Sequence, residues 1–373
     1  MVAAMALSAG LSASSAADLE FLKELVSIPS ASADIPQVNR AMRAMKAYLE
    51  KRGVWCIIET TPKGNEVLFA ATTPGKEQDF ILSVHLDVVP ASAPGQYEMK
   101  MENGRLTGRG VYDCKGSCIV VAETLAKLDG KASAGCIFGA DEEIGGFSTK
   151  WMVEEKGYRP RKMAIVHDAR YGAVCYAQKG QCMVRISAKG RGGHSSRPWE
   201  SDDSITRLAR GYLKIREAWD ARHPARDDRW WDVLTPTIVR SKGEADNRIP
   251  DEVGMTLNLR SVNPGAKDEL LALIRGETDL DAELLRYSPP FETDQNHPLV
   301  QRLRRTMSTV CGMNVTMGRM FAASDARCFT SCPVPIAITG NRGGDPHADT
   351  EWADPESFDK AVEYLTRFIL GKD

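Results

Sequence analysis

The stretch FILSVHLDVVP, residues 80–90, decides the fold. Residues 81–84 are apolar or small, which indicates a buried strand, and this strand leads directly into His85 and Asp87. A buried strand that ends in ionisable side chains is typical of a site at the carboxyl edge of a parallel sheet. Residues two apart in extended chain project to the same side, so Asp87 can accept the second ring N–H of a metal-bound His85. The alternative is a hydrogen-bonded histidine in a loop, because short motifs give many false matches.

The composition is that of a folded protein with two domains of ordinary size. The chain has 373 residues, of which 43% are hydrophobic and 26% charged, and both values fit a globular protein. Its formal net charge is −2, so there is no basic field that favours nucleic acid or an anionic membrane as a partner. No run of about 18 apolar residues occurs, and we therefore expect no membrane span.

The cysteines and the N-terminus bear on the location of the protein. The nine cysteines contain no CxxC pair, which predicts free thiols in a reducing, cytoplasmic compartment. Residues 1–17 are small and mildly apolar without a positively charged start, and we interpret them as a flexible leader. Their alanine-rich end can mimic a cleavage site, which leaves export as the alternative.

Hydrophobic periodicity in the first half predicts strands that alternate with helices. Strands are predicted at 54–58, 66–71, 80–84, 136–140 and 163–166, and helices at 18–28, at 38–49 and after 111. Three of these strands run into acids or a histidine, at His85, at Asp141 and at His167-Asp168. Such polar groups at one edge of a sheet predict an α/β domain with its site at that edge.

The pattern changes near residue 180 to a β-α-β-β-α-β order, which is typical of a ferredoxin-like antiparallel sheet. Its strands are predicted at 182–189, 234–240, 253–260 and 282–287, its helices at 201–217 and 266–276, and a polar linker at 218–232. Alternation resumes with helices at 298–310 and 355–370 and strands at 314–319 and 334–339. We therefore expect a catalytic α/β domain, a mixed sheet with helices on both faces, from residues 18–179 and 291–373. Residues 180–290 form an inserted α+β ferredoxin-like domain.

Five candidate metal ligands follow the strands or glycine-rich turns: His85, Asp113, Glu143, Asp168 and His347. Two histidines and three carboxylates are too many for one tetrahedral zinc but suit two metals that share a bridging carboxylate. Such a pair acidifies a bridging water and polarises a scissile carbonyl. Glu142, next to a proposed ligand, is then the candidate general base that passes the proton of the water to the leaving amine.

Each of these acids has a simpler interpretation, because a single Asp or Glu most often lies on a solvated face. The Asp-Glu-Glu run at 141–143 can be an ordinary acidic turn. A metal-binding or scaffold protein with a lapsed catalytic site is a second hypothesis, although none of the proposed ligands is missing. A serine or cysteine hydrolase is a third, but no GxSxG motif occurs and Cys114 has no evident histidine partner.

The motifs SVHLDVVP, GRGVYDCKG, DEEIGG, RGGHSSRP and GGDPHADTE stand in this order along the chain. In order and approximate spacing the sequence resembles the di-zinc metallopeptidase and deacylase family. That family includes acetylornithine deacetylase, succinyl-diaminopimelate desuccinylase, aminoacylase-1 and the carboxypeptidase G type enzymes. The resemblance extends from about residue 18 to the end.

The resemblance implies two Zn²⁺ ions per chain, with Asp113 as the bridging ligand. It implies His85 and Asp168 on one ion, Glu143 and His347 on the other, Asp87 as the orienting acid and Glu142 as the base. The same nitrogen and oxygen ligands also accept Co²⁺ or Mn²⁺.

The resemblance also implies that the inserted domain is a lid through which a homodimer forms. The family's oxyanion-stabilising histidine, which reaches the site of the partner, matches His194; a loop histidine that caps a helix is the alternative. The family's residues that hold the substrate carboxylate match Asn247, Arg260 and Arg327. Bidentate arginine suits that task, but each arginine can also form a surface ion pair.

Two positions depart from the family pattern. Cys114 follows the bridging position, where many relatives carry Asp or Met, and Asp168 stands where deacetylases and desuccinylases usually carry Glu. The aspartate favours the peptidase-like members. We expect a metal-dependent exopeptidase that cleaves an amide next to a free carboxylate, with an N-acyl-amino-acid deacylase as the alternative. The substrate is then a small peptide or an N-acyl amino acid, and His167 is structural.

Overall fold

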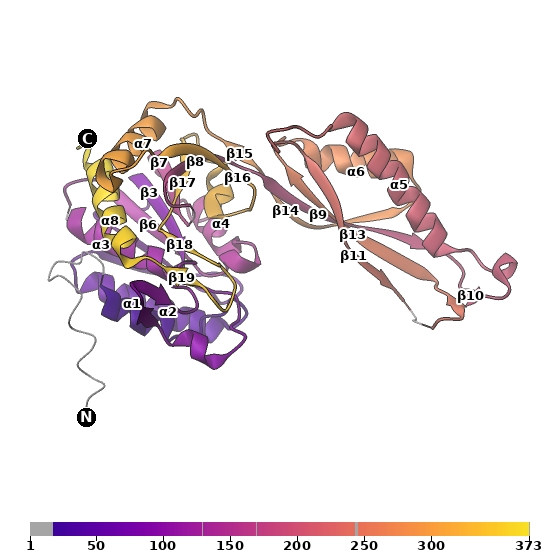
Figure 1. Ribbon diagram of the computed structural model, residues 1–373, viewed down its shortest axis with the longest axis horizontal. Coiled ribbons are helices and arrows are strands. Elements are labelled where there is room, and N and C mark those ends of the chain that lie inside the picture. The colour runs from indigo at the N-terminus through magenta and orange to yellow at the C-terminus, as the bar shows by residue number, and fades with distance from the viewer. Residues whose placement is uncertain (1–17, 129, 169, 243–244, 373) are drawn as a thin grey trace. The chain divides into compact units, whose positions relative to one another are not determined.

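The computed structural model describes residues 18–128, 130–168, 170–242 and 245–372. The chain divides into two compact units (Figure 1). The α/β unit contains the described residues up to Tyr176, then Glu292–Arg319, and the residues from Ser324 onward. The inserted unit contains Ala177–Phe291 and Met320–Ala323. The predicted leader, residues 1–17, lies outside the described residues. Among the described helices, none combines the length and the apolar character that crossing a membrane requires.

The α/β unit is built on a mixed sheet of nine strands in the order β1-β2-β6-β3-β7-β17-β8-β15, with β16 paired to β8. The strands are β1 (Trp55–Thr60), β2 (Glu66–Ala71), β3 (Gln78–His85), β6 (Ala134–Gly139), β7 (Pro160–His167), β8 (Ala173–Gln178), β15 (Phe291–Glu292), β16 (Thr316–Met320) and β17 (Ile336–Thr339). The central strands β6, β3, β7 and β17 are parallel. Their carboxyl ends therefore meet at one edge of the sheet.

Helices cover both faces of this sheet (Figure 1). They are α1 (Leu19–Val26), α2 (Ile35–Glu50), α3 (Lys115–Leu128), α4 (Phe147–Glu154), α7 (Pro298–Cys311) and α8 (Pro355–Leu370). Asp18, Asp34 and Asp354 begin α1, α2 and α8 by accepting a backbone N–H of the first turn, as N-cap residues do. Gly116 of α3 packs so closely on α8 that a Cβ there would lie 2.7 Å from the Phe358 ring.

A small second sheet joins two loops of the α/β unit that are distant in sequence. Its strands are β4 (Lys100–Glu102), β5 (Arg105–Thr107), β18 (Gly343–Gly344) and β19 (Trp352–Ala353), in the order β18-β19-β5-β4. The pairing places Trp352 opposite Thr107 and Ala353 opposite Leu106. The loop after β5 and the loop before β19 therefore lie side by side.

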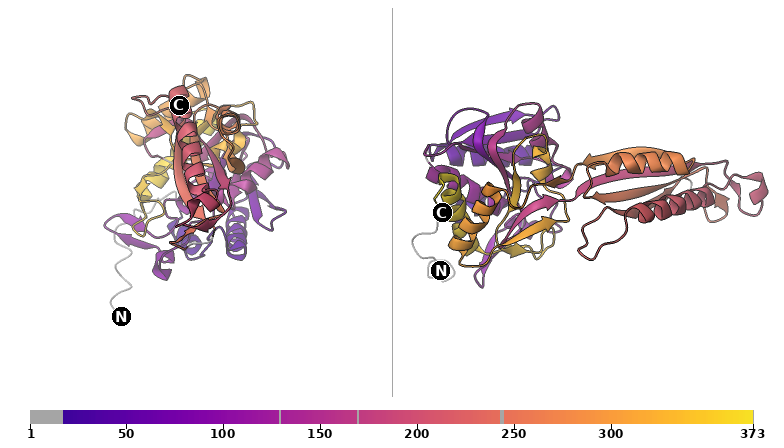
Figure 2. Two further views of the ribbon diagram at one scale, coloured as in Figure 1. Left: turned by 90° about the vertical axis from the view of Figure 1, so that its right-hand side faces the viewer. Right: turned by 90° about the horizontal axis from the view of Figure 1, so that it is seen from above.

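The inserted unit is a four-stranded antiparallel sheet in the order β11-β13-β9-β14. Its elements follow one another as β9 (Gly180–Lys189), α5 (Ser204–Arg222), β11 (Val233–Ser241), β13 (Glu252–Ser261), α6 (Ala266–Glu277) and β14 (Asp281–Ser288). This is the predicted ferredoxin-like order, and both helices cover one face of the sheet (Figure 2). A ribbon of β10 (Gly193–His194) and β12 (Arg248–Ile249) extends from it.

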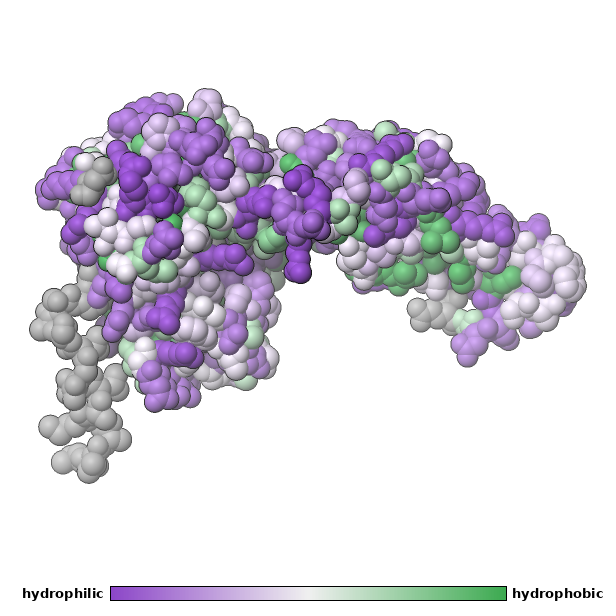
Figure 3. Space-filling model, turned by 45° about the horizontal axis from the view of Figure 1, so that its top comes forward, coloured by the Kyte–Doolittle hydropathy of each residue, from purple (hydrophilic) through white to green (hydrophobic). Residues whose placement is uncertain are grey.

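The edge strands of the inserted unit carry exposed apolar side chains. Ile238 and Val239 on β11 are 44% and 62% exposed, and Leu284 and Leu285 on β14 are 43% and 39% exposed. Figure 3 shows apolar residues gathered over this unit among polar ones. Exposed edge strands with apolar side chains are surfaces on which another chain can pair.

Two details differ from the sequence-based expectations. Helix α5 continues to Arg222, into the segment predicted as a linker, and buries Trp219 in the core of the inserted unit. This end of the helix was missed because polar residues surround Trp219 in the sequence. Helix α4 was not expected, because Ser148–Lys150 interrupt its apolar pattern, and the short strand β8 was not expected either.

Candidate metal centre

The carboxyl ends of the parallel strands supply most of the predicted site. His85 is the last residue of β3, Asp168 directly follows β7, and Glu142–Ile144 form a short 3₁₀ turn after β6. His85 lies opposite Gly139 in the parallel pairing of β3 with β6. Asp113 lies in the loop between β5 and α3, and His347 lies in the loop between β18 and β19. The two sheets thus bring together five side chains that span 262 positions of the chain, from His85 to His347.

Asp113 offers one carboxylate oxygen to each of the two histidines. Its Oδ1 lies 3.1 Å from His85 Nε2, and its Oδ2 lies 3.2 Å from His347 Nε2. Burial would raise the pKa of Asp113, but these two histidines outweigh burial and lower it below its usual value. The aspartate therefore stays ionised between two imidazoles, as a carboxylate shared by two sites must.

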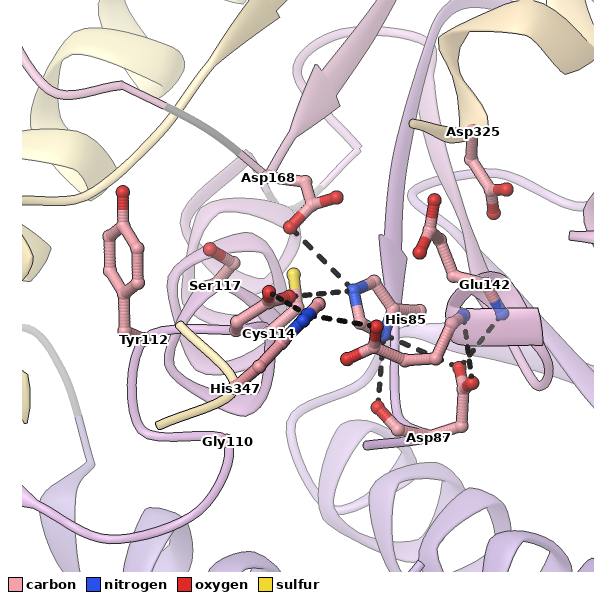
Figure 4. A network of polar contacts seen from close by, with 12 residues as sticks. His85, Asp87, Gly110, Tyr112, Cys114, Ser117, Glu142, Asp168, Asp325 and His347 are labelled. Atoms are coloured by element: carbon pink, nitrogen blue, oxygen red, sulfur yellow. Dashed lines mark hydrogen bonds and ion pairs between the residues drawn. The ribbon is translucent and has the colours of Figure 1, made fainter. Parts of the chain in front are cut away.

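Each histidine has a second carboxylate beside it. His85 Nε2 lies 3.6 Å from Asp168 Oδ1, and His347 Nε2 lies 3.0 Å from Glu143 Oε2. Figure 4 shows the Asp168 carboxylate and the His347 ring turned toward His85. Burial would lower the pKa of His85, but the surrounding carboxylates, Asp168 first, raise it well above its usual value. The histidines and acids thus form two adjacent groups that share Asp113.

Asp87 holds the other side of the centre in place. His85 Nδ1 lies 3.0 Å from the backbone oxygen of Asp87 and 3.3 Å from its Oδ1. The same fully buried carboxylate accepts the backbone N–H groups of Glu142 and Glu143 at 3.1 and 3.2 Å and the Ser32 hydroxyl at 2.6 Å. Asp87 therefore contacts the histidine ring through both its backbone and its carboxylate, and it also holds the turn that carries both glutamates.

Glu142 lies beside a second acid, Asp325, which is buried. Figure 4 shows its carboxylate turned toward that of Asp325, which accepts a hydrogen bond of 2.6 Å from the Thr149 hydroxyl. Burial, and next the charge of Asp325, raise the pKa of Glu142 well above its usual value. A carboxyl group with a raised pKa holds a proton more readily, which suits a general acid–base role. Asp325 was not found from the sequence, because a lone acid in ASDAR has no distinguishing pattern.

Arg327 lies behind Glu142. Its guanidinium is 3.8 Å from Glu142 Oε1 and 3.7 Å from Asp325 Oδ1, and its side chain is only 6% exposed. Gly146 leaves room for this arrangement, because a Cβ there would lie 2.1 Å from Asp325 Oδ1. Arg327 therefore faces two carboxylates of its own chain.

The remaining predicted residues belong to the inserted unit. His194 and Asn247 lie next to each other on the β10–β12 ribbon, where the Ser195 N–H donates to the Asn247 backbone oxygen at 2.9 Å. Arg260 lies near the other end of β13, and the strand from Glu252 to Arg260 spans about 26 Å at about 3.3 Å per residue. Within this unit, Asn247 and Arg260 are therefore too far apart to hold one carboxylate together.

The residues of the centre fit divalent cations. One ligand atom each from His85, Asp113 and Glu143 lie within 4.8 Å of one another, and so do those from His85, Cys114 and Asp168. The buried Oε1 of Glu143 has no hydrogen-bond partner among the described residues, which an adjacent cation would remedy. Histidine and carboxylate donors are those that zinc and similar metals take. His167, in contrast, is fully buried between Thr339 and Asn341, and burial lowers its pKa to about 4.

Comparison with known proteins decides the family. Residues 81–371 match the sequence profile of Peptidase family M20/M25/M40. The chain belongs to this family. It is accordingly a metallohydrolase of the M20 type, among whose members are both peptidases and deacylases.

Similar proteins include both of these activities. A putative [LysW]-lysine/[LysW]-ornithine hydrolase of Pyrobaculum aerophilum is 26% identical over 76% of this chain and 79% of its own length. A succinyl-diaminopimelate desuccinylase of Wolinella succinogenes is 25% identical over 86% and 90%. The M20 metallo-carboxypeptidase Sso-CP2 of Sulfolobus solfataricus has the same fold, with a TM-score of 0.78, 16% identity and coverage of 94% and 98%.

Proposed function

We propose that this M20 chain is a di-zinc exopeptidase, of carboxypeptidase or dipeptidase type, that hydrolyses an amide bond next to a free carboxylate. One observation carries the proposal: Asp113 presents one oxygen to His85 and the other to His347. This is the arrangement needed for one carboxylate to bridge two cations.

The proposed ligand sets follow from the two groups around Asp113. His85 and Asp168 would hold one Zn²⁺, Glu143 and His347 would hold the other, and Asp113 would bridge them. Co²⁺ or Mn²⁺ can replace zinc with these donors. When bound, the cations would acidify water and polarise the scissile carbonyl. Asp87 would orient His85 through Nδ1, which leaves Nε2 as the atom that would bind a cation.

Glu142 is the proposed general base. Its raised pKa and its position, with only 12% of the side chain exposed, suit a group that accepts a proton from the attacking water and returns it to the leaving amine. Arg327, beside Glu142, is the proposed anchor for the free carboxylate of the substrate within the α/β unit. Asn247 and Arg260 are proposed to add contacts to that carboxylate from the inserted unit.

An N-acyl-amino-acid deacylase is the alternative, and the names of two similar proteins support it. Two of them, at 25% and 26% identity, are a desuccinylase and a [LysW]-amino-acid hydrolase. Asp168, which stands in place of the usual glutamate of deacetylases and desuccinylases, favours the peptidase. A peptidase and a deacylase would use the same metal centre. Their substrates differ in the group attached to the nitrogen or to the carbonyl of the amide that is cleaved.

Metal removal followed by a substrate panel tests the proposal. We expect a chelator to abolish hydrolysis, and two equivalents of Zn²⁺ to restore it. The panel would contain dipeptides, N-acetyl amino acids and N-succinyl amino acids, each with a free carboxylate and with the matching carboxamide. Cleavage of dipeptides, and loss of rate with the carboxamides, would support the exopeptidase. Preference for the acyl amino acids would establish the deacylase instead, and metal binding without any turnover would indicate a lapsed site.

A homodimer formed through the inserted unit is part of the proposal. The exposed apolar residues on both edge strands, β11 and β14, support it, since burying them requires a partner. His194 and Asn247 lie about one strand length from Arg260, so a single inserted unit cannot bring all three to one substrate. In a symmetric dimer the partner's His194 would complete the site and stabilise the developing oxyanion.

Mixing two inactive variants tests this exchange of residues. We expect refolded mixtures of His194→Ala and Glu142→Gln subunits to regain activity, because in each mixed dimer one site contains both an intact Glu142 and an intact His194. Random pairing makes half of the dimers mixed, so the recovery should approach about a quarter of wild-type activity. Mixing Glu142→Gln with Asp113→Asn is the control, since both lesions lie in the α/β unit and no recovery should follow. Equal lack of recovery in both mixtures would assign each site to one subunit.

A further inference from the structure

Glu351 is a buried acid close to the metal centre that the proposed mechanism does not use. It lies four residues after His347 in the GGDPHADTE motif, and it is 2% exposed. Its Oε1 accepts the backbone N–H groups of Gly110, Tyr112 and Asp113 at 2.9, 3.0 and 3.1 Å. Its Oε2 accepts a charge-assisted hydrogen bond of 2.8 Å from the guanidinium of Arg109. One carboxylate thus binds the whole turn that ends in the bridging aspartate.

Arg109 extends this contact to the other histidine loop. It is 2% exposed, and its second terminal nitrogen donates to the backbone oxygen of His347 at 3.0 Å. The backbone of His347 has φ +68°, in the left-handed region that residues other than glycine rarely adopt. A residue keeps such a conformation only where its surroundings hold it there. The Arg109–Glu351 pair is therefore placed to hold both the Asp113 loop and the His347 loop.

Close backbone packing surrounds this pair. Strand β19 starts directly after Glu351 and pairs with β5, and the backbone N–H of Gly108 lies 3.4 Å from the backbone oxygen of Glu351. Gly343 of β18 also packs closely on the Asp113 loop, because a Cβ at this position would lie 2.2 Å from the ring of Tyr112. The two loops therefore have little freedom to separate while the carboxylate remains in place.

We infer that Glu351 is a positioning residue, which with Arg109 sets the spacing of the Asp113 and His347 side chains before any cation binds. This inference rests on the proposed function, since it concerns the same metal centre. If Glu351 served only to form a stabilising ion pair, Arg109 would be a sufficient partner. Glu351 also accepts three backbone N–H groups from the turn that carries Asp113, a proposed metal ligand. Glu351 itself would not contact a cation; it acts through the backbone of Asp113.

Glu351→Gln, which keeps the volume but removes the charge, is the principal test. In a competition with a chromophoric chelator, we expect Zn²⁺ affinity to fall by about 10- to 100-fold, as for other residues that orient metal ligands. The matched control is Glu59→Gln in the same unit. Glu59 lies on β1 and likewise binds side-chain partners, the Tyr158 hydroxyl at 3.0 Å and Lys156 Nζ at 2.8 Å. This control should bind Zn²⁺ as the wild type does.

Two further readouts separate positioning from a general loss of stability. In the metal-free protein, the amides of Gly110, Tyr112 and Asp113 should exchange hydrogen slowly in the wild type and in Glu59→Gln, and faster in Glu351→Gln. The d–d absorption spectrum of the Co²⁺-loaded protein should change in Glu351→Gln and stay constant in Glu59→Gln, because it reports the arrangement of the ligands.

Arg109→Met is the second variant, in case Glu351→Gln folds poorly. It removes the bond to the His347 backbone oxygen but leaves the three N–H bonds of Glu351. We expect it to weaken Zn²⁺ binding while the three amides stay protected. Wild-type Zn²⁺ affinity in both Glu351→Gln and Arg109→Met would overturn the positioning role and leave the proposed function intact. Failure of the wild type itself to bind any divalent cation would overturn the proposed function, and this inference with it.

Discussion

Glu142→Gln should retain two metal ions per chain and lose about 100- to 10,000-fold in kcat, the usual contribution of a general acid–base group. The amide keeps the shape of the side chain and the backbone N–H bond to Asp87, so the metal ligands stay in place. It cannot accept a proton, however. KM should change little, because the substituted group acts on the water and the leaving amine and not on the bound substrate.

Steady-state kinetics and metal analysis on the same sample check this result. Glu154→Gln is a suitable control, because Glu154 is 39% exposed on α4 and pairs with Lys150 across the helix surface. Its kcat should match that of the wild type. Full activity in Glu142→Gln would remove Glu142 from the role of base, whereas loss of metal together with activity would assign it to metal binding.

Asp113→Asn should have the second large effect, through loss of the metals themselves. The asparagine replaces one of two anionic oxygens with an N–H₂ group, which would face His85 or His347 as a donor and repel a cation. We expect metal content to fall from two ions to one or none. Loss of metal charge stabilisation is worth several kcal/mol, and about 4 kcal/mol corresponds to about a 1,000-fold lower kcat/KM.

Metal content after dialysis, measured by plasma mass spectrometry, checks the second prediction alongside circular dichroism for folding. Asp79→Asn is the matched control: Asp79 lies on β3 with His85, but near the opposite end of the strand, where it pairs with Arg161 and Lys162. That variant should keep both ions. Two ions retained in Asp113→Asn would contradict a bridging role for this carboxylate.

The residues of the centre that follow strands could be predicted from the sequence. An apolar run indicates the buried strand, and the ionisable residues after it indicate a site. Residues 81–84 and 163–166 are apolar or small because they are buried in the sheet, and the first ionisable residues after them mark its edge. The parallel pairing of β3 with β6 and β7 then brings these edges together. The β-α-β-β-α-β order of the inserted unit was predictable for the same reason.

The supporting contacts could not be predicted, because they join residues that are distant in sequence and leave no periodic pattern. Glu351 binds the N–H of Gly110 from 241 positions away, and any acid in a polar loop would look the same. Asp325 and Thr149 are likewise 176 positions apart. The second task of Asp87, which holds the backbone of Glu142 and Glu143, depends on a turn whose shape the sequence does not specify.

The order of the chain has a consequence for how the protein is made. Strand β17, which pairs with β7, follows the inserted unit in the sequence. His347 and Glu351 come later still. While a ribosome has exposed only the part of the chain up to β14, four of the five proposed donors and Asp87 are already present. The second histidine is not. Stable uptake of both proposed ions must therefore wait until His347 has been synthesised, and a chain that stops short of this residue would have an incomplete centre.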